Sequence, residues 1–461
     1  MIANLTEGPV AGHLRRQATP MAVGLLAIFS FDAVDLFFIS QLGDAPLAAI
    51  SFAFPIIWLL SAIGIGFEAG ASSCISRAVG QNDQNKARRL TTDTAVLATL
   101  VAFVLCLVGL ATIRPVFSAL GATEEVMPLI EDYMGVWYWV EPVATAMWLC
   151  LAGIRARGNT LLEGKVITVA ALLNAVLDPI LIFGWFGFPR LEIRGAAIAS
   201  LIANVVMLCF TLVYLHTKLR VFANPFAKFS AILDSWRQIL RIAAPAALTY
   251  ATVPISNAIV VAMVADYGLN AVAGFGIAMR IEPIALIFFY SLSAIASPFV
   301  GMNFSARQFD RLLEARRVIA RFCVIFGLVL AASLDLAAFP LTSLFTASDS
   351  IQSVAVEYLW LVSISYGAHG LIMTANSIFN GLGTPMPAVV LTSLRVIFVF
   401  LPLAFIGRRL FDLQGIFAAS AIANIAIGTL AYYWVGFRIR SLNGYGTDSK
   451  AKVEPAGSVE R

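Results

Sequence analysis

Long apolar runs recur along this chain from one end to the other, and they restrict its fold more than any other feature of the sequence. A helix needs about 20 predominantly apolar residues to cross a hydrocarbon core of about 30 Å. Only 13% of the residues are charged, whereas a soluble domain has about a quarter. Because lipid offers the backbone no hydrogen-bond partner, such runs form helices and not open strands. The sequence therefore predicts an all-α integral membrane protein embedded in a lipid bilayer.

The apolar runs predict twelve transmembrane helices, six in each half of the chain. The first run follows Arg15 and Arg16 and is too long for the apolar segment of a cleaved signal peptide, so we expect it to stay as the first span. The predicted spans are 17–40, 46–76, 90–113, 127–155, 160–186, 195–217, 241–265, 271–302, 315–345, 351–381, 386–408 and 414–438.

Lysine and arginine are distributed unevenly between the two sets of loops. Most of the 31 lie in the N-terminal segment, in the loops after spans 2, 4, 6 and 8, and in the C-terminal tail. Positive loops mark the cytoplasmic side, so we expect both termini in the cytoplasm and the chain in the inner (plasma) membrane. The opposite loops hold only a few: Arg114, Arg190, Arg194, Arg408 and Arg409.

The two halves of the chain are copies of each other. A shift of 225 residues superposes Pro20 on Pro245 and Tyr133 on Tyr358, and GAAIASLIAN near the end of the first half matches GIFAASAIAN in the second. Repeats with an even number of spans share one orientation and meet at a cavity, which favours alternating access. We expect two parallel six-helix repeats.

The repeat sets the predicted domain boundaries. Residues 1–217 form the N-terminal six-helix lobe, 218–240 a charged cytoplasmic linker, and 241–440 the C-terminal six-helix lobe. The tail, 441–461, is polar and predicted to be disordered.

Signatures of soluble enzymes are absent from the sequence. It contains no Walker-type phosphate loop, no HExxH and no CxxC, and it has only three histidines. We therefore expect no enzyme activity, no bound metal or cofactor and no nucleic-acid partner. An ion gradient must then drive any uphill transport. An integral membrane enzyme or receptor is the alternative from another class.

Carboxylates inside spans are the functional candidates, because charge at mid-bilayer is costly and usually faces a cavity. Asp32 and Asp35 lie near the middle of span 1, and Asp178 lies in span 5 one helical turn after Asn174. If both helices line one cavity, Asp35 and Asp178 repel each other away from water, and one of them can take up and release a proton. The alternative is that these are hydrogen-bonded packing residues. For Asp32 that alternative is equally favoured, because its repeat mate is Asn257.

The repeat restricts this cluster to one half. Asp35 superposes on Val260, and the 386–408 span, which matches the span of Asp178, contains no carboxylate. Pro20 lacks an N–H for the carbonyl of Arg16, so it is a candidate hinge in span 1. A static kink, repeated at Pro245, is the other interpretation of Pro20.

Aromatic side chains flank the carboxylates and suit flat, cationic organic compounds through stacking and cation–π contacts. Tyr133 and Trp139 are interpreted as an interfacial aromatic belt. The candidate substrate-binding residues are Phe31, Tyr138, Trp148, Asn204 and Arg280.

Two further patterns have structural interpretations. Arg280 and Glu282 are close in sequence and could form a mutual charge pair. Gly66 and Gly70, in a GxxxG spacing, favour a close helix contact over a substrate site.

The arrangement resembles the multidrug and toxic compound extrusion (MATE) family, and within it the DinF-like branch. The resemblance covers about residues 10–440 and rests on ATPMAVGLLAIFSFDAVDLFFISQLGDAPLAA, on the AVGQND loop, on GNT after span 4 and on LNAVLDPILIFG in span 5. It implies a V-shaped bundle that exchanges drugs for protons or sodium. It also implies ion-coupling roles for Asp35, Asn174 and Asp178, and a bending role for Pro20.

The sequence departs from relatives that complete a sodium site. Span 4 has no Asn, and span 6 begins with Gly195-Ala196-Ala197 in place of a Thr. Since a hard cation needs several oxygen ligands, protons are favoured over sodium. We expect a monomeric, proton-coupled exporter of small organic compounds, with Asp35 as the main proton carrier. A sodium-coupled drug antiporter and a flippase of lipid-linked precursors are the alternatives.

Overall fold

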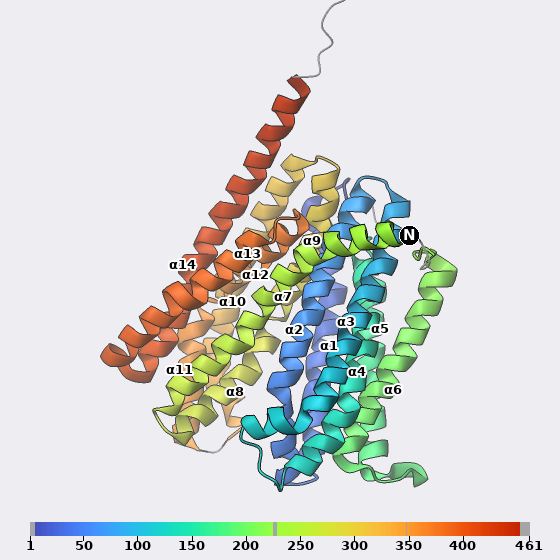
Figure 1. The fold of residues 1–461 in the computed structure, drawn as a ribbon. Helices are drawn as coiled ribbons and strands as arrows, with labels where there is room; N and C mark the ends of the chain where they lie inside the picture. Colours follow the sequence, from blue (N-terminus) through green and yellow to red (C-terminus); the bar gives the residue numbers. More distant parts are fainter. Residues whose placement is uncertain (1–4, 225–227, 347, 452–461) are drawn as a thin grey trace, which may run out of the picture.

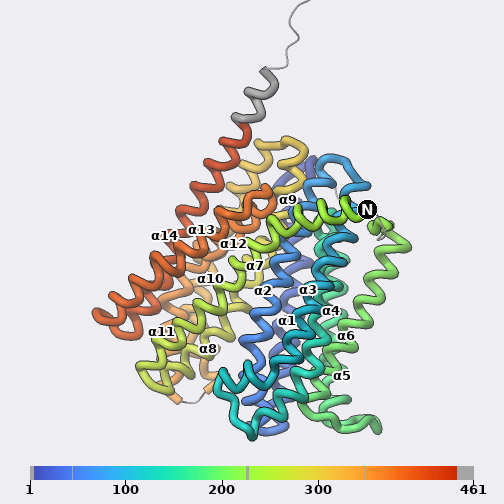
Figure 2. Tube along the Cα trace, in the orientation of Figure 1, coloured from blue at the N-terminus to red at the C-terminus, as the bar shows by residue number. Residues whose placement is uncertain are grey.

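A computed structural model describes residues 5–224, 228–346 and 348–451. Regular structure in these residues is helical throughout, which confirms the predicted all-α class. The helices of the first half, α1 to α6, lie side by side, and those of the second half, α7 to α14, form a second group against them (Figure 1). Figure 2 shows the same two groups of helices along the chain trace.

In the first half each predicted span is one helix. Most helices extend a few residues beyond the predicted bounds, as polar ends reach past the apolar core. The elements are α1 (Val10–Ser40), α2 (Asp44–Gly80), α3 (Gln84–Ala119), α4 (Met127–Arg155), α5 (Thr160–Phe183), a 3-10 turn η1 (Trp185–Gly187), α6 (Glu192–Tyr214) and a π-turn η2 (Leu215–Leu219).

In the second half several spans are broken. Span 8 is α8 followed by α9, and span 10 is α11 followed by α12. Spans 11 and 12 meet inside α14, where Phe411 and Asp412 leave the helical conformation. Counted in this way, the second half also has six spans. The elements are α7 (Phe229–Ala265), α8 (Leu269–Ala285), α9 (Ile287–Ser305), α10 (Phe309–Ser343), α11 (Asp349–Ser363), α12 (Tyr366–Gly381), α13 (Met386–Ser393), a π-turn η3 (Leu394–Phe400) and α14 (Leu401–Ala451).

Small residues bring α2 of the first half against α7 of the second. A methyl group added at Gly70 would lie 3.1 Å from the Cβ of Ala243, and one added at Gly66 would lie 2.6 Å from the Cβ of Ala247. Within the first half, α1 meets α5 where Gly24 faces Gly164. Close backbone approach at small residues is typical of helix packing in membranes. The structural interpretation of Gly66 and Gly70 is confirmed.

The predicted linker and tail both contain helix. Residues 229–240 of the linker form the start of α7. Residues 441–451 of the tail continue α14, so this part differs from the predicted disorder. Residues 452–461 lie outside the described residues, and disorder stays a prediction for them.

Candidate functional site

A polar cluster joins α1, α5 and α6 inside the first half. The Nδ2 of Asn174 donates a hydrogen bond to Oδ1 of Asp178 at 3.0 Å, which agrees with their predicted spacing of one helical turn. The hydroxyl of Ser200, from α6, donates to Oδ1 of Asn174 at 3.1 Å. Asp35, from α1, lies close enough for its negative charge to repel that of Asp178. The structure thus brings Asp35, Asn174 and Asp178 together.

The two carboxylates of this cluster are incompletely satisfied. Asp178 is fully buried, and its Oδ2 has no hydrogen-bond partner in the described part of the chain. Oδ1 of Asp35 is also buried without a partner. A buried charge without a partner is costly, whereas the protonated carboxyl is not. The arrangement therefore suits groups that bind and release a proton.

Tyr133 is misplaced by the sequence interpretation. Its side chain is 7% exposed, so it is not part of an interfacial belt. Instead it lies near the charges of Asp32, Asp35 and Asp178. Trp139 is 42% exposed, and its position in an interfacial belt stays a prediction. The sequence of α4 could not separate the two residues. They lie on different faces of the helix, and the sequence does not show which face packs against the neighbouring helices.

Pro20 lies inside α1, which runs unbroken from Val10 to Ser40. A methyl group added at Gly164 of α5 would collide with the carbonyl of Pro20. One turn earlier, the hydroxyl of Thr160 donates to the carbonyl of Gln17 at 3.0 Å. The proline is therefore held against the helix that carries Asp178.

The candidate substrate-binding residues are scattered. Asn204 lies beside the cluster, because its Nδ2 donates to the carbonyl of Ser200 at 2.9 Å. Phe31 is partly exposed on α1, four residues before Asp35. Tyr138 is buried, and its ring packs against Gly109 of α3. These three come from three different helices of the first half.

Trp148 and Arg280 lie elsewhere. Trp148 packs against a buried apolar group that includes Met147, Val166 and Met207. Arg280 is exposed and forms no ion pair with Glu282 among the described residues, so the predicted charge pair is wrong. Residues two positions apart on a helix do not face each other, so closeness in the sequence does not bring Arg280 and Glu282 into contact.

Glu282 belongs instead to a polar network in the second half. Its Oε2 accepts hydrogen bonds from the hydroxyls of Tyr358 at 2.6 Å and Tyr366 at 3.5 Å. Arg395, in the π-turn η3, donates to Oδ1 of Asn424 at 3.0 Å and lies 3.3 Å from Nδ1 of His369. π-turns inside helices occur often at functional sites.

A buried ion cluster in the first half was missed by the sequence reasoning. Arg155, at the end of α4, forms ion pairs with Glu163 of α5 and, at 2.8 Å, with Glu68 of α2. Arg155 is 4% exposed and Glu163 is fully buried. Glu68 and Glu163 both lie inside predicted spans, and charge inside a span was the signal that could have identified them.

Two parallel repeats of six helices, one of which holds incompletely satisfied buried carboxylates, are the architecture of a membrane transporter. The family model MatE matches residues 20–180 and 245–406, more than half of the chain. The chain belongs to the MatE family, the multidrug and toxic compound extrusion transporters.

Individual relatives extend over nearly the whole chain. A protein of Shewanella oneidensis named FAD transporter is 34% identical over 93% of this chain and 95% of its own length. The multidrug export protein MepA of Staphylococcus aureus is 25% identical over 91% of this chain and 92% of its own length. A crystal structure of an aspartate-to-asparagine mutant of the Vibrio cholerae MATE transporter VcmN has a TM-score of 0.90 and 29% identity, covering 94% of this chain and 98% of that one.

Proposed function

We propose that this transporter exports organic compounds, mainly cationic or aromatic ones, in exchange for protons. The observation that carries the proposal is the pair of buried, incompletely satisfied carboxylates, Asp35 and Asp178. Two like charges held together away from water favour the binding of a proton to one of them. Release of that proton on the other side of the membrane, as the lobes rearrange, couples the gradient to export.

Proton coupling is favoured over sodium coupling by the bonding within the cluster. A hard cation needs several oxygen ligands. Here Oδ1 of Asp178 accepts a hydrogen bond from the amide nitrogen of Asn174, and the amide oxygen of Asn174 accepts one from the hydroxyl of Ser200. These two oxygens are therefore already engaged and are poor candidates for sodium ligands. The transporter uses the proton gradient and needs no bound cofactor. Membership of the DinF-like branch stays a prediction.

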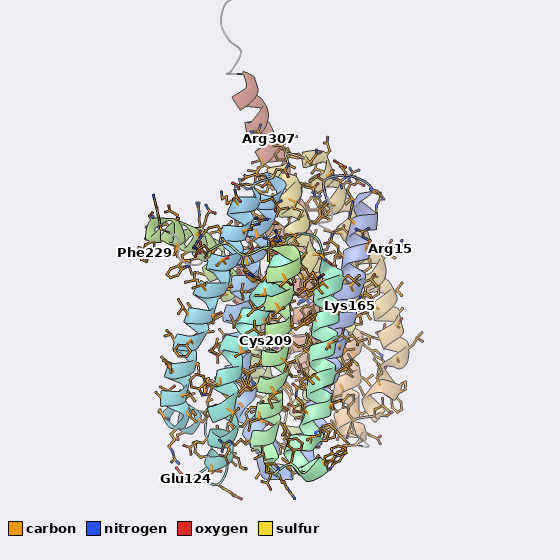
Figure 3. The ribbon with its side chains drawn as sticks, turned by 90° about the vertical axis from the view of Figure 1, so that its right-hand side faces the viewer. Arg15, Glu124, Lys165, Cys209, Phe229 and Arg307 are labelled. Atoms are coloured by element: carbon orange, nitrogen blue, oxygen red, sulfur yellow. The ribbon has the colours of Figure 1, made fainter. Side chains whose placement is uncertain are left out.

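The same proposal includes an orientation. We place both termini in the cytoplasm, in the inner membrane, with a monomer as the working unit. The side-chain view supports one basic end: Arg15 and Arg307 lie toward one end of the bundle, and Glu124 lies at the opposite end (Figure 3). Basic residues mark the cytoplasmic side.

The test is efflux of a cationic dye from proteoliposomes under an imposed pH gradient and, separately, under a sodium gradient alone. We expect transport with the pH gradient only, and its loss in Asp35→Asn. Asp335→Asn, the same change on α10 of the other half, is the matched control and is expected to transport normally. Efflux driven by a sodium gradient alone would show that sodium, and not the proton, is the coupling ion. Normal efflux by Asp35→Asn would refute the proposed coupling site.

FAD is a second candidate substrate, favoured by the 34% identity to the relative named FAD transporter. FAD carries planar aromatic rings like those of the proposed compounds, but its pyrophosphate makes it an anion. Efflux of FAD and of a cationic dye should therefore be measured in the same proteoliposomes. Transport of FAD without transport of the dye would contradict the proposed preference for cationic substrates, but it would leave the proposed coupling site unaffected. Scrambling of a lipid-linked precursor would favour the flippase alternative.

A further inference from the structure

A basic pocket lies where the two halves meet, away from the carboxylate cluster. Its volume is about 250 Å³. It is formed by the end of α2, the start of α3 and the first part of α7, which places it at the end of the bundle where the N-terminus lies (Figure 1). The lining residues are Cys74, Arg77, Ala78, Gln81, Lys86, Gln238 and Arg241.

The three cations of the pocket have no counter-charge in it. The lining contains no carboxylate. None of Arg77, Lys86 and Arg241 takes part in an ion pair with another described residue. Arg77 is fixed by a hydrogen bond from its Nε to the carbonyl of Ser73 at 3.2 Å. Like charges gathered in a concave site attract an anion.

The internal repeat supplies a second observation, because it relates this pocket to a groove between α1, α9 and α10. A shift of 225 places Gln238 on His13, and a shift of 221 places Asn82 on Asn303. In the related groove, Nε2 of His13 lies 2.6 Å from the carbonyl oxygen of Glu7. Nδ2 of Asn303 donates to the carbonyl of Leu5 at 3.2 Å.

The chain itself therefore fills the related groove. Arg311 of α10 donates to the carbonyl of Gly8 at 2.6 Å and to that of Leu5 at 2.9 Å. Leu5 is fully buried in the core of the second half. The segment before α1 thus brings oxygen acceptors to the donors of its groove. In the α2–α3–α7 pocket, Gln238, the equivalent of His13, lines a cavity, whereas Asn82, the equivalent of Asn303, is exposed outside it.

We propose that the pocket binds a phosphate group, with Arg77, Lys86 and Arg241 as its cationic ligands. Arginine and lysine are the usual phosphate ligands, and basic pockets between helices on the cytoplasmic side bind anionic lipid headgroups. The group belongs to an anionic lipid or to a soluble phosphate compound. Because α2 and α3 come from one half and α7 from the other, the bound group ties the halves together at this end.

Thermal unfolding of the full-length chain in nanodiscs tests the site. Wild type is measured in phosphatidylcholine alone, in phosphatidylcholine with phosphatidylglycerol, and in phosphatidylcholine with inorganic pyrophosphate in the buffer. The pocket variant is Lys86→Gln with Arg241→Gln. The matched control, Arg88→Gln with Arg237→Gln, removes the same charge from exposed positions of the same two helices that do not line the pocket.

A ligand that binds only the folded state raises Tm. We expect phosphatidylglycerol to raise the Tm of wild type and control, and the pocket variant to lose at least half of that rise. The same pattern with pyrophosphate alone identifies a soluble source. Equal shifts in the pocket variant and the control, or no shift of wild type with either probe, would overturn the proposal. If the double variant does not fold, Lys86→Gln alone, at an exposed position in the first turn of α3, replaces it in the same comparison.

Discussion

The two halves of the molecule share a repeat but treat their buried charges differently. In the first half, Asp35 and Asp178 each keep a carboxylate oxygen without a partner. In the second half, Glu282 accepts from two tyrosine hydroxyls, and Arg395 lies near enough for its charge to act on that carboxylate. In the first half, ionising these two carboxylates is therefore unfavourable. In the second half, the charge of Glu282 is largely compensated by its neighbours.

The difference shows how a duplicated bundle can divide its tasks. A polar network in which most groups are bonded fixes the packing around it, and changing a member has a high cost. An incompletely bonded carboxylate can change its protonation state with little loss of bonding. We infer that the first half carries the coupling ion and that the network of the second half is structural.

We expect the largest difference in efflux between the two halves when one carboxylate in each half is neutralised. Asp178→Asn should lose most efflux driven by a pH gradient, because it removes a proton site. Glu282→Gln should keep most of it, because the amide oxygen can still accept from Tyr358. Efflux from proteoliposomes with matched protein content measures both. Equal losses would show that the second half also carries the coupling ion.

The first half also contains partly compensated charge, where one arginine, Arg155, faces the two carboxylates of Glu68 and Glu163. We expect this cluster to be structural, like the network of the second half. Arg155→Met leaves Glu68 and Glu163 without their counter-charge. Removing one partner of a buried ion pair costs about 3–5 kcal/mol. We therefore expect a large fall in Tm, measured by tryptophan fluorescence in detergent.

The control for Arg155 is Arg114→Met, which breaks an exposed pair with Glu131. Exposed pairs contribute about 0–1 kcal/mol, so its Tm should barely change. Equal Tm values for the two variants would show that the buried cluster is not structural.

The sequence predicted the fold more fully than the site. Apolar runs and the repeat were enough for the twelve spans, because lipid leaves helices as the only solution for such runs. The turn at Asp412 falls in the loop predicted between spans 11 and 12. The apolar runs did not predict the breaks at Leu286 inside span 8 and at Ile364 inside span 10, which no proline or glycine at those two positions marks.

Within the site, spacing along one helix was predictable and contact between helices was not. Asn174 and Asp178 are one turn apart, so their hydrogen bond follows from helix geometry. The bond from Ser200 and the burial of Tyr133 depend on how α6 and α4 pack against α5 and α1. No pattern within a single span carries that information.

A smaller effect is expected from loosening the network of the second half. Tyr358→Phe removes a hydroxyl donor from a buried carboxylate, and an unsatisfied buried group costs about 1–3 kcal/mol. Tm should fall while efflux per folded molecule is retained. The repeat-related change, Tyr133→Phe, lies beside the proposed proton-binding cluster. We expect it to alter the dependence of efflux on pH more than Tm, and the reverse outcome would remove the division of tasks.

The smallest expected effect compares the repeat-related prolines. Both Pro20 and Pro245 lie inside helices, and each deprives the carbonyl one turn earlier of its partner. Only the helix of Pro20 also carries a carboxylate for which we propose a coupling role. If bending of α1 links protonation of Asp35 to opening, Pro20→Ala should slow efflux a few-fold, while Pro245→Ala should leave the rate unchanged. Both variants should gain Tm, since alanine restores a helical hydrogen bond. Initial efflux rates under a fixed pH gradient distinguish a hinge at Pro20 from a static kink, for which the two rates would be equal.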